Sequence, residues 1–213
     1  MSNTSSDLSQ SLKELGFTKK SIVEIILVTV NNNGTFNAAP MGVVNHNSVI
    51  ETRPFLTSRT YQNLHRYKKA AINITNNPYI FLATAFKDEI ENPPRIIDFM
   101  LEDSEAVIRV EKISESKYSE LQAVFLLKPL EIMINRQKPL VFSRGRAEAI
   151  EAVIHATRIK VFDVENQRKK VTMLMERLDY CLKVIDRVSE KYTPEMIVAE
   201  KIRDMIEHWG IKK

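Results

Sequence analysis

The sequence predicts an α+β protein, in which a small antiparallel β-barrel is followed by a C-terminal block of three helices. Residues 21–142 contain short β-branched runs separated by turn residues, a pattern typical of antiparallel strands. After residue 143, apolar residues recur every three or four positions, which is the spacing of helices that pack by one face. Because the strands come first and the helices afterwards, we do not expect a parallel doubly wound sheet.

The chain is expected to have three parts. Residues 1–20 form a polar leader with a short helix at Leu8–Leu15, residues 21–142 form the barrel, and residues 143–213 form a helical domain. Gly16 should end the first helix, because glycine readily adopts the left-handed conformation that follows a helix.

The barrel is expected to begin with a hairpin. Ile22–Val30 is a β-branched run of strand length, and Asn31–Gly34 ends in Asn-Gly, which supplies the positive φ of a tight turn. Thr35–Pro40 can then return antiparallel to the first strand. Met41–Glu51 continues as extended chain around a polar turn at Asn45–Ser48.

The middle of the chain adds a helix and further strands. Apolar and aromatic residues spaced three apart predict a helix over Arg59–Lys69, with Thr57 or Ser58 as its cap. A charged stretch around Pro93 and Pro94 is expected to be a loop. The further strands are expected at Ala70–Thr75, Tyr79–Phe86, Ala106–Ile113 and Glu131–Asn135.

Three amphipathic helices are expected in the C-terminal part, at Ala147–Ile159, Val171–Val188 and Met196–Trp209. By themselves, about seventy helical residues bury only a thin core. We therefore expect these helices to pack on the barrel or on a second subunit.

Composition and charge exclude several classes of protein. The 31 basic and 27 acidic residues leave a net charge of only +4, spread along the chain, so we expect no nucleic-acid partner. No apolar stretch approaches the ~20 residues that cross a bilayer, and we find no signal-peptide pattern, so we expect no membrane association. The single cysteine, Cys181, excludes an internal disulfide and indicates a reducing, cytoplasmic location.

The sequence contains none of the common catalytic or metal-binding motifs. It has no GxGxxG, P-loop, HExxH, GxSxG or CxxC pattern, and its four histidines lack ligand spacing. We therefore assign no metal site and no catalytic residue. His155 is expected to be structural because it lies beside the apolar face of its helix. Asp98, Glu102 and Asp103 are expected to be solvated.

The segment around the predicted helix start offers a place for a phosphate group. The hydroxyls of Ser58 and Thr60, the free N–H groups of the helix start, and the guanidinium of Arg59 or Arg53 can together satisfy phosphate oxygens. The same pattern also describes an ordinary helix cap beside a solvated arginine. The sequence leaves both interpretations open.

Gly42 is a second local signal, because it follows Pro40 within an expected strand. A residue without a Cβ at such a position often marks the close approach of a ligand plane or of another backbone. A β-bulge has the same pattern, so the sequence does not decide between these explanations.

These residues resemble the superfamily of FMN-binding split β-barrel proteins, which includes flavin reductases and pyridoxamine phosphate oxidases. The likeness is good over residues 1–90 and looser to about residue 140. The C-terminal helices look like those of an uncharacterised branch known only as a domain of unknown function. The segments that carry the resemblance are Ile26–Val30, Asn31–Gly34, Asn37–Val43, Arg53, Ser58–Leu64, Ala71–Thr75, Ser143–Arg146 and Ala156–Arg158.

The resemblance implies an antiparallel split β-barrel and a homodimer with FMN near the subunit interface. It places the FMN phosphate on Ser58–Thr60 and the flavin ring against the strand Pro40–Val43. Because a bound flavin carries out the electron chemistry itself, no catalytic side chain is required. The cofactor-binding residues implied in this way are Pro40, Met41, Gly42, Val43, Arg53, Thr57, Ser58, Arg59, Thr60, Asn63 and Asn73.

One motif of the superfamily is missing. Its flavin reductases usually carry Gly-Asp-His late in the barrel, and no position here matches, which puts NAD(P)H-dependent flavin reduction in doubt. The helical extension could instead select a different substrate, and Arg144 or Arg146 could bring positive charge to the flavin.

We therefore expect an FMN-binding flavoprotein that acts as an oxidoreductase on an unidentified small substrate. Two alternatives remain open. The chain could be a flavin-binding or dimeric interaction module without turnover, or a dimeric scaffold with an empty pocket in which Ser58–Thr60 only cap a helix.

Overall fold

We analysed a computed structural model of the 213-residue chain, which describes residues 5–17, 22–135 and 144–211. The described residues of 1–75 and 94–138 form one compact unit, the barrel unit, and those of 76–93 and 139–213 form a second, the helical unit. Residues 76–93 pack with the C-terminal helices, although the sequence analysis placed them within the barrel domain. The expected domain boundaries, after residues 20 and 142, fall outside the described residues.

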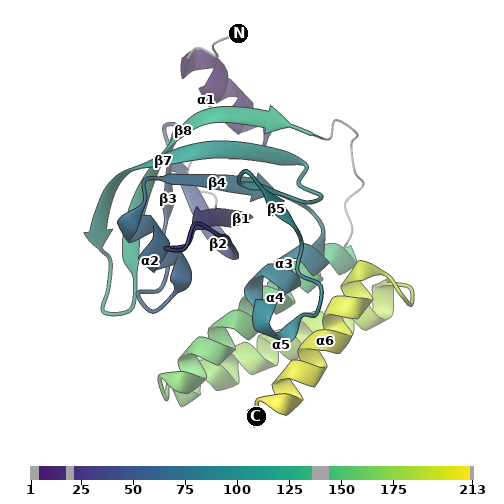
Figure 1. The fold of residues 1–213 in the computed structure, drawn as a ribbon. Coiled ribbons are helices and arrows are strands. Elements are labelled where there is room, and N and C mark those ends of the chain that lie inside the picture. Colours follow the sequence, from purple (N-terminus) through teal and green to yellow (C-terminus); the bar gives the residue numbers. More distant parts are fainter. Residues whose placement is uncertain (1–4, 18–21, 136–143, 212–213) are drawn as a thin grey trace. The chain divides into compact units, whose positions relative to one another are not determined.

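The barrel unit contains a closed antiparallel barrel, which confirms the predicted fold class (Figure 1). Around the barrel the order of strands is β1-β2-β3-β8-β7-β4. The described strands of the barrel are β1 (Ile22–Val30), β2 (Phe36–His46), β3 (Val49–Thr52), β4 (Lys69–Ile74), β7 (Ala106–Lys117) and β8 (Ala123–Ile134).

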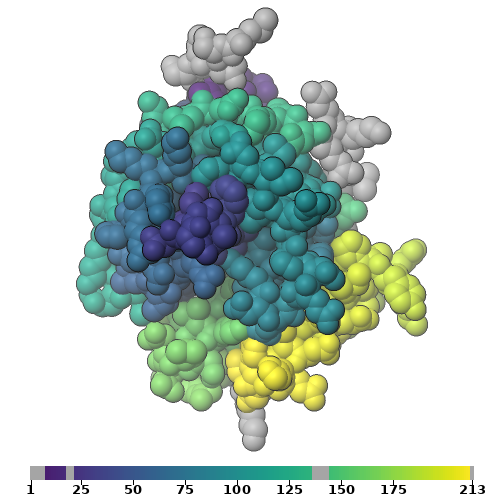
Figure 2. Space-filling model, viewed as in Figure 1, coloured from purple at the N-terminus to yellow at the C-terminus, as the bar shows by residue number. Residues whose placement is uncertain are grey.

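The first hairpin forms as the sequence predicts. β1 and β2 pair from Ile22↔Val44 to Val30↔Phe36 without a register shift. Gly34 has a φ of 81° in the connecting turn, where a residue without a Cβ is tolerated best. The tip of this hairpin lies at the surface of the barrel unit (dark purple in Figure 2).

The barrel core is filled by alternate residues of its strands, because successive side chains of a strand point to opposite faces. Helix α1 (Ser5–Glu14) adds Leu12 to this core, and Phe17, just beyond the helix, joins it too. The buried Asn45 amide donates a hydrogen bond to the Phe17 carbonyl at 2.7 Å, which ties this segment to β2. The strand residues of the core include Ile25, Leu27, Val43, Ile50, Ile72, Ile108, Val110, Phe125 and Leu127.

The expected strand at Tyr79–Phe86 is wrong, because this segment forms helix α3 (Pro78–Ala85). The Asn77 side chain caps it by accepting a hydrogen bond from the Tyr79 N–H at 3.0 Å, and Pro78 occupies the first turn. The helix is apolar all round, so its sequence shows no helical period. In a short apolar run only the Asn-Pro start distinguishes a helix from a strand.

The charged connection after α3 is not entirely a loop. It contains a short 3₁₀ turn, η1 (Lys87–Glu89), in the helical unit. In the barrel unit it contains a small two-stranded sheet of β5 (Ile96–Ile97) and β6 (Met100–Leu101). Asp98 and Phe99, at the turn of this β5–β6 hairpin, have φ values of 46° and 67°.

The three C-terminal helices are confirmed and are longer than predicted at several ends. They are α4 (Arg144–Val164), α5 (Arg168–Val188) and α6 (Pro194–His208), and α4 contacts α3, α5 and α6. Lys160 on α4 pairs with Glu89 at 2.6 Å and lies over the Trp209 ring. Among the described helices, none has the length and apolar character needed to cross a membrane.

Gly145 lies where α4 approaches the end of α5 and the start of α6. A Cβ at this position would overlap Ser189 Oγ and lie 3.3 Å from Glu195 Cγ. We expect Gly145→Ala to lower the free energy of unfolding of the helical unit by about 1–3 kcal/mol, measured by urea denaturation. Because the overlap is with Ser189 Oγ, adding Ser189→Ala should restore most of the loss. A Gly145→Ala variant as stable as the parent would contradict this packing.

Candidate functional site

Ser58 is the cap of helix α2 (Arg59–Arg66), one of the two caps that the sequence predicts. Its hydroxyl accepts a hydrogen bond from the Tyr61 N–H at 3.1 Å and donates one to the Phe55 carbonyl at 2.7 Å. A hydroxyl has a single proton to donate, so in this conformation Ser58 cannot also donate to a phosphate. Thr57 is exposed and does not cap the helix.

The start of α2 carries uncompensated positive charge. Arg59 is exposed and has no ion-pair or hydrogen-bond partner among the described residues. The first turn of α2 contains no acidic residue. The N–H groups that begin a helix have no acceptor within it, and the helix dipole adds further positive potential there. This helix end is therefore chemically suited to an anion.

A buried network of hydrogen bonds fixes α2 on the first hairpin. Thr60 accepts from the Asn37 amide at 3.4 Å, and the same amide reaches Thr29 Oγ1 at 3.4 Å. The Asn63 amide donates to Thr29 Oγ1 at 3.0 Å and to Asn31 Oδ1 at 2.9 Å. Thr60 and Asn63 were expected to contact the cofactor directly, and the structure gives their polar groups this positioning role.

Strand β2 is paired on both sides over only part of its length. β3 pairs with β2 from Val43 to His46, so among the described strands the half Phe36–Gly42 pairs with β1 alone. Asn37, which bonds Thr60, lies three residues before Pro40. At about 3.3 Å per residue, about 10 Å of strand separates Pro40 from Asn37, the residue that holds α2.

The four residues predicted to face a flavin ring divide between two faces of β2. Val43 is buried in the barrel core and Met41 packs against the same core. Because side chains alternate along a strand, Pro40 and Gly42 lie on the opposite face. Pro40 and Gly42 are therefore the members of this group that present a surface outside the core.

The close approach at Gly42 is made by side chains of β1. A Cβ at Gly42 would lie 3.3 Å from Glu24 Oε1 and 3.3 Å from Ile22 Cγ2. The β1–β2 register has no shift at this position, so Gly42 does not mark a bulge. Glu24 is thus the nearest ionisable group to this part of β2, and nothing in the sequence pattern had pointed to it.

The structure distinguishes Arg53 from Arg59. The Arg53 Nε donates to Glu51 Oε1 at 2.6 Å, and its guanidinium lies 4.2 Å from the centre of the Tyr118 ring. Its carbonyl accepts from the Gln122 side chain at 3.0 Å. Arg53 is therefore held by Glu51 of β3 and by the connection between β7 and β8, whereas Arg59 has no ion-pair partner among the described residues.

Asn73 fixes the β5–β6 hairpin. Its amide donates to the Phe99 carbonyl at 3.0 Å, and its Oδ1 accepts from the Leu101 N–H at 2.8 Å and from the Ser104 hydroxyl at 2.9 Å. The Phe99 ring packs edge-on against Phe36, with 4.9 Å between ring centres. Asn73 is fully buried, so its first role is to position this hairpin beside the start of β2.

Pockets are found away from the predicted residues. One of about 410 Å³ lies beside the β5–β6 hairpin in the barrel unit and is lined by residues such as Arg95, Met100 and Arg109. Another, of about 390 Å³, lies between α5 and α6 and is mostly apolar. Among the described residues, no group of three or more His, Cys, Asp or Glu side chains is arranged to hold a metal ion.

The ionisable groups with shifted pKa values belong to the helical unit. Burial raises the pKa of the Cys181 thiol to about 12, and a hydrogen bond to Glu148 adds to the shift. Burial also lowers the pKa of His155, whose Nδ1 is buried without a hydrogen-bond partner. Arg144 and Arg146 lie at the start of α4 in the same unit, and their proposed contact with a flavin stays a prediction.

Comparison with known proteins identifies the family. Residues 23–136 match the family described as the N-terminal domain of a protein of unknown function, DUF447. The chain belongs to the DUF447 family. This confirms the resemblance to an uncharacterised branch with a helical extension. No curated protein matches this DUF447 chain.

Several solved structures are similar to this DUF447 chain, and the first described here shares its fold. An FMN-bound DUF447 protein from Methanosarcina mazei is 24% identical with a TM-score of 0.70, over 91% of this chain and 98% of that one. A flavin reductase domain protein from Arthrobacter is 14% identical with a TM-score of 0.44, over 63% and 98% of the two chains. The styrene monooxygenase flavin reductase from Pseudomonas putida is 10% identical with a TM-score of 0.45, over 57% and 93%.

The buried His155 predicts how stability depends on pH. In the folded chain, burial lowers the pKa of His155 below its ordinary value of 6.5. The negative charge of Glu151 opposes this shift, and the positive charges of Arg158 and Arg177 add to it. Below pH 6.5 the unfolded chain therefore binds more protons, so the free energy of unfolding should fall as pH decreases. We expect urea midpoints to drop between about pH 7.5 and about pH 5.5, and to drop less in His155→Gln. An unchanged drop in the variant would show that other groups cause it.

Proposed function

We propose that this DUF447 chain binds FMN and holds its phosphate at the start of helix α2. The N–H groups of Arg59 and Thr60, the Arg59 guanidinium and the Thr57 hydroxyl supply the donors. The observation that carries the proposal is the exposed, unpartnered Arg59 at a helix start without an acidic residue. The FMN bound to the family member from Methanosarcina mazei supports it.

The flavin ring is proposed to lie against the outer face of β2 at Pro40 and Gly42. This half of the strand pairs on one side only, which leaves main-chain groups available to a planar ligand. The hydrogen bond between Asn37 and Thr60 fixes α2 to β2. This supports one ligand reaching from the start of α2 to Pro40 and Gly42. Met41 and Val43 support the strand from within the core.

We propose further that the chain is an oxidoreductase acting on a small substrate. A bound flavin supplies the transfer of electrons or hydride, and the protein supplies binding, orientation and a surrounding charge distribution. The alternative is a flavin-binding module without turnover. Steady oxidation of NADH, NADPH or another hydride donor by the FMN-loaded protein would favour the enzyme, and its absence with every donor would favour the module.

A homodimer in the cytoplasm, with the flavin near the subunit interface, completes the proposal. The single cysteine is free and buried, which is consistent with a reducing compartment. Light scattering decides the oligomeric state, and a monomer at micromolar concentration would remove the dimer from the proposal.

Arg59→Gln tests the phosphate site. The variant should lose about 1.5–3 kcal/mol of FMN binding, or about 10- to 100-fold in affinity, because a charge-assisted hydrogen bond is removed. Arg66→Gln is the matched control, because it removes an exposed arginine from the other end of the same helix. Its affinity should equal that of the parent.

The measurement is a titration with FMN, followed by removal of the excess and a visible spectrum. Bands at about 375 and about 450 nm should stay with the parent and with Arg66→Gln. A parent protein that stays colourless would overturn the proposed function. Equal losses in the two variants would place the phosphate elsewhere.

A further inference from the structure

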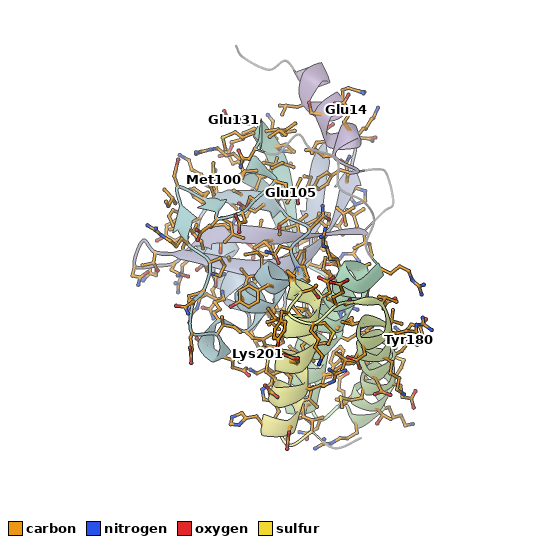
Figure 3. All side chains as sticks on the ribbon, turned by 90° about the vertical axis from the view of Figure 1, so that its right-hand side faces the viewer. Glu14, Met100, Glu105, Glu131, Tyr180 and Lys201 are labelled. Carbon is orange, nitrogen blue, oxygen red and sulfur yellow. The ribbon has the colours of Figure 1, made fainter. Side chains whose placement is uncertain are left out.

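The pocket beside the β5–β6 hairpin has no role in the proposed flavin site. It measures about 410 Å³, and its lining includes Arg95, Ile97, Asp98, Met100 and Arg109. None of the residues predicted to bind the cofactor lines it. Figure 3 labels Met100, from the hairpin, and Glu131, from the strand β8 that pairs with β7.

Of the two neighbouring donor nitrogens Nε and Nη2 of Arg109, on β7, only Nη2 makes a hydrogen bond. Its Nη2 donates to Asp98 Oδ2 at 2.6 Å. Its Nε is buried without a hydrogen-bond partner, and the nearby Glu131 Oε2, at 3.6 Å, is too distant for a hydrogen bond. A guanidinium normally offers two parallel N–H groups to one carboxylate, and a buried donor left without an acceptor costs free energy. The site therefore lacks one acceptor oxygen beside Nε.

The carboxylate that now contacts Arg109 is weakly held. The Asp98 side chain is 69% exposed and lies at the turn of the β5–β6 hairpin, whose strands have two residues each. An exposed ion pair of this kind contributes little stability, so another carboxylate can replace Asp98 at low cost. Arg95, also in the lining, has no ion-pair partner among the described residues.

We propose that this pocket binds a small organic monocarboxylate, with Arg109 as its anchor. The ligand carboxylate accepts from both Nε and Nη2 and takes the place of Asp98. The apolar body of the ligand packs against Ile97, Met100 and Leu101, which line the same pocket. Arg95, which also lines the pocket, adds a second positive charge.

The charge around the pocket selects against more highly charged ligands. Glu102 and Asp103 line it, and Glu131 lies 3.6 Å from Arg109. These three carboxylates outnumber the two arginines, so a dianion such as a phosphate monoester is repelled more strongly than a monocarboxylate. The pocket thereby differs from the start of α2, where no acidic residue lies in the first turn.

The pocket is connected to the strand proposed to carry the flavin ring. Phe99, in the turn of the hairpin, packs on Phe36 at the start of β2, and Asn73 holds the Phe99 carbonyl. We infer further that the bound carboxylate is the flavin's substrate, and this step rests on the proposed function. The binding of the carboxylate does not.

Benzoate is the probe, because it joins one carboxylate to a flat apolar body. Calorimetric titration of the full chain without FMN should show binding, and Arg109→Gln should weaken it about tenfold or more. Asp98→Asn should strengthen binding about three- to tenfold, because it removes the charge that competes for Arg109. Phenyl phosphate should bind the parent at least about tenfold more weakly than benzoate.

Arg203→Gln is the matched control. Arg203 pairs with Asp186 at the same 2.6 Å, but in the helical unit, so its loss should leave benzoate affinity unchanged. If Arg109→Gln does not fold, the gain in Asp98→Asn decides the matter. No benzoate binding by parent and Asp98→Asn, equal binding of phenyl phosphate, or an unchanged affinity in Arg109→Gln would each overturn the proposal.

A separate FMN titration distinguishes this pocket from the flavin site. Arg109→Gln should bind FMN as the parent does while losing benzoate. A chain that binds benzoate but not FMN would keep the carboxylate pocket and remove the proposed flavin function. A chain that binds FMN but not benzoate would keep the proposed flavin function and remove the carboxylate pocket.

Discussion

Hydrogen bonds buried between helix α2 and the first hairpin determine where the candidate site lies. A helix of eight residues is too short to be stable alone, so its position depends on what holds it. Leu64 anchors it in the barrel core, and the amides of Asn37 and Asn63 join it to β1 and β2. Because these bonds are buried, breaking one leaves a polar group without water or a partner. The direction of the helix start, and of its unpaired arginine, is thereby fixed.

A second buried amide, that of Asn73, organises the connection between β4 and β7. The connection between β4 and β7 is long, and it contributes α3 to the helical unit before returning as the β5–β6 hairpin. Two strands of two residues each have few main-chain bonds of their own. Asn73 supplies the missing constraint through three hydrogen bonds. The proposed flavin site and the proposed carboxylate pocket therefore both depend on buried asparagines of the strands, Asn37 for the first and Asn73 for the second.

The sequence predicted features whose causes are local. The β1–β2 hairpin follows from β-branched runs around an Asn-Gly turn, and the Ser58 cap follows from the residue type before a helix. Helix α3 was missed because its apolar sequence has no period, although Asn77-Pro78 carried the signal. The roles of Asn37 and Asn73 depend on partners more than twenty residues away, so no local pattern reveals them. Arg109 and Asp98 are 11 residues apart, and their pairing depends on the turn of the β5–β6 hairpin, which no local pattern reveals either.

Proline at position 40 has a consequence beyond ligand binding. Thr52 Oγ1 donates to the Gly42 carbonyl, so the main chain of Gly42 faces the β3 side, and that of Pro40, two residues earlier, faces the same side. This is the side on which the first half of β2 has no partner strand among the described residues. An open strand edge invites pairing with another chain, and proline removes the N–H that such pairing requires. The position proposed to lie against a planar ligand is thus also protected against edge-to-edge aggregation.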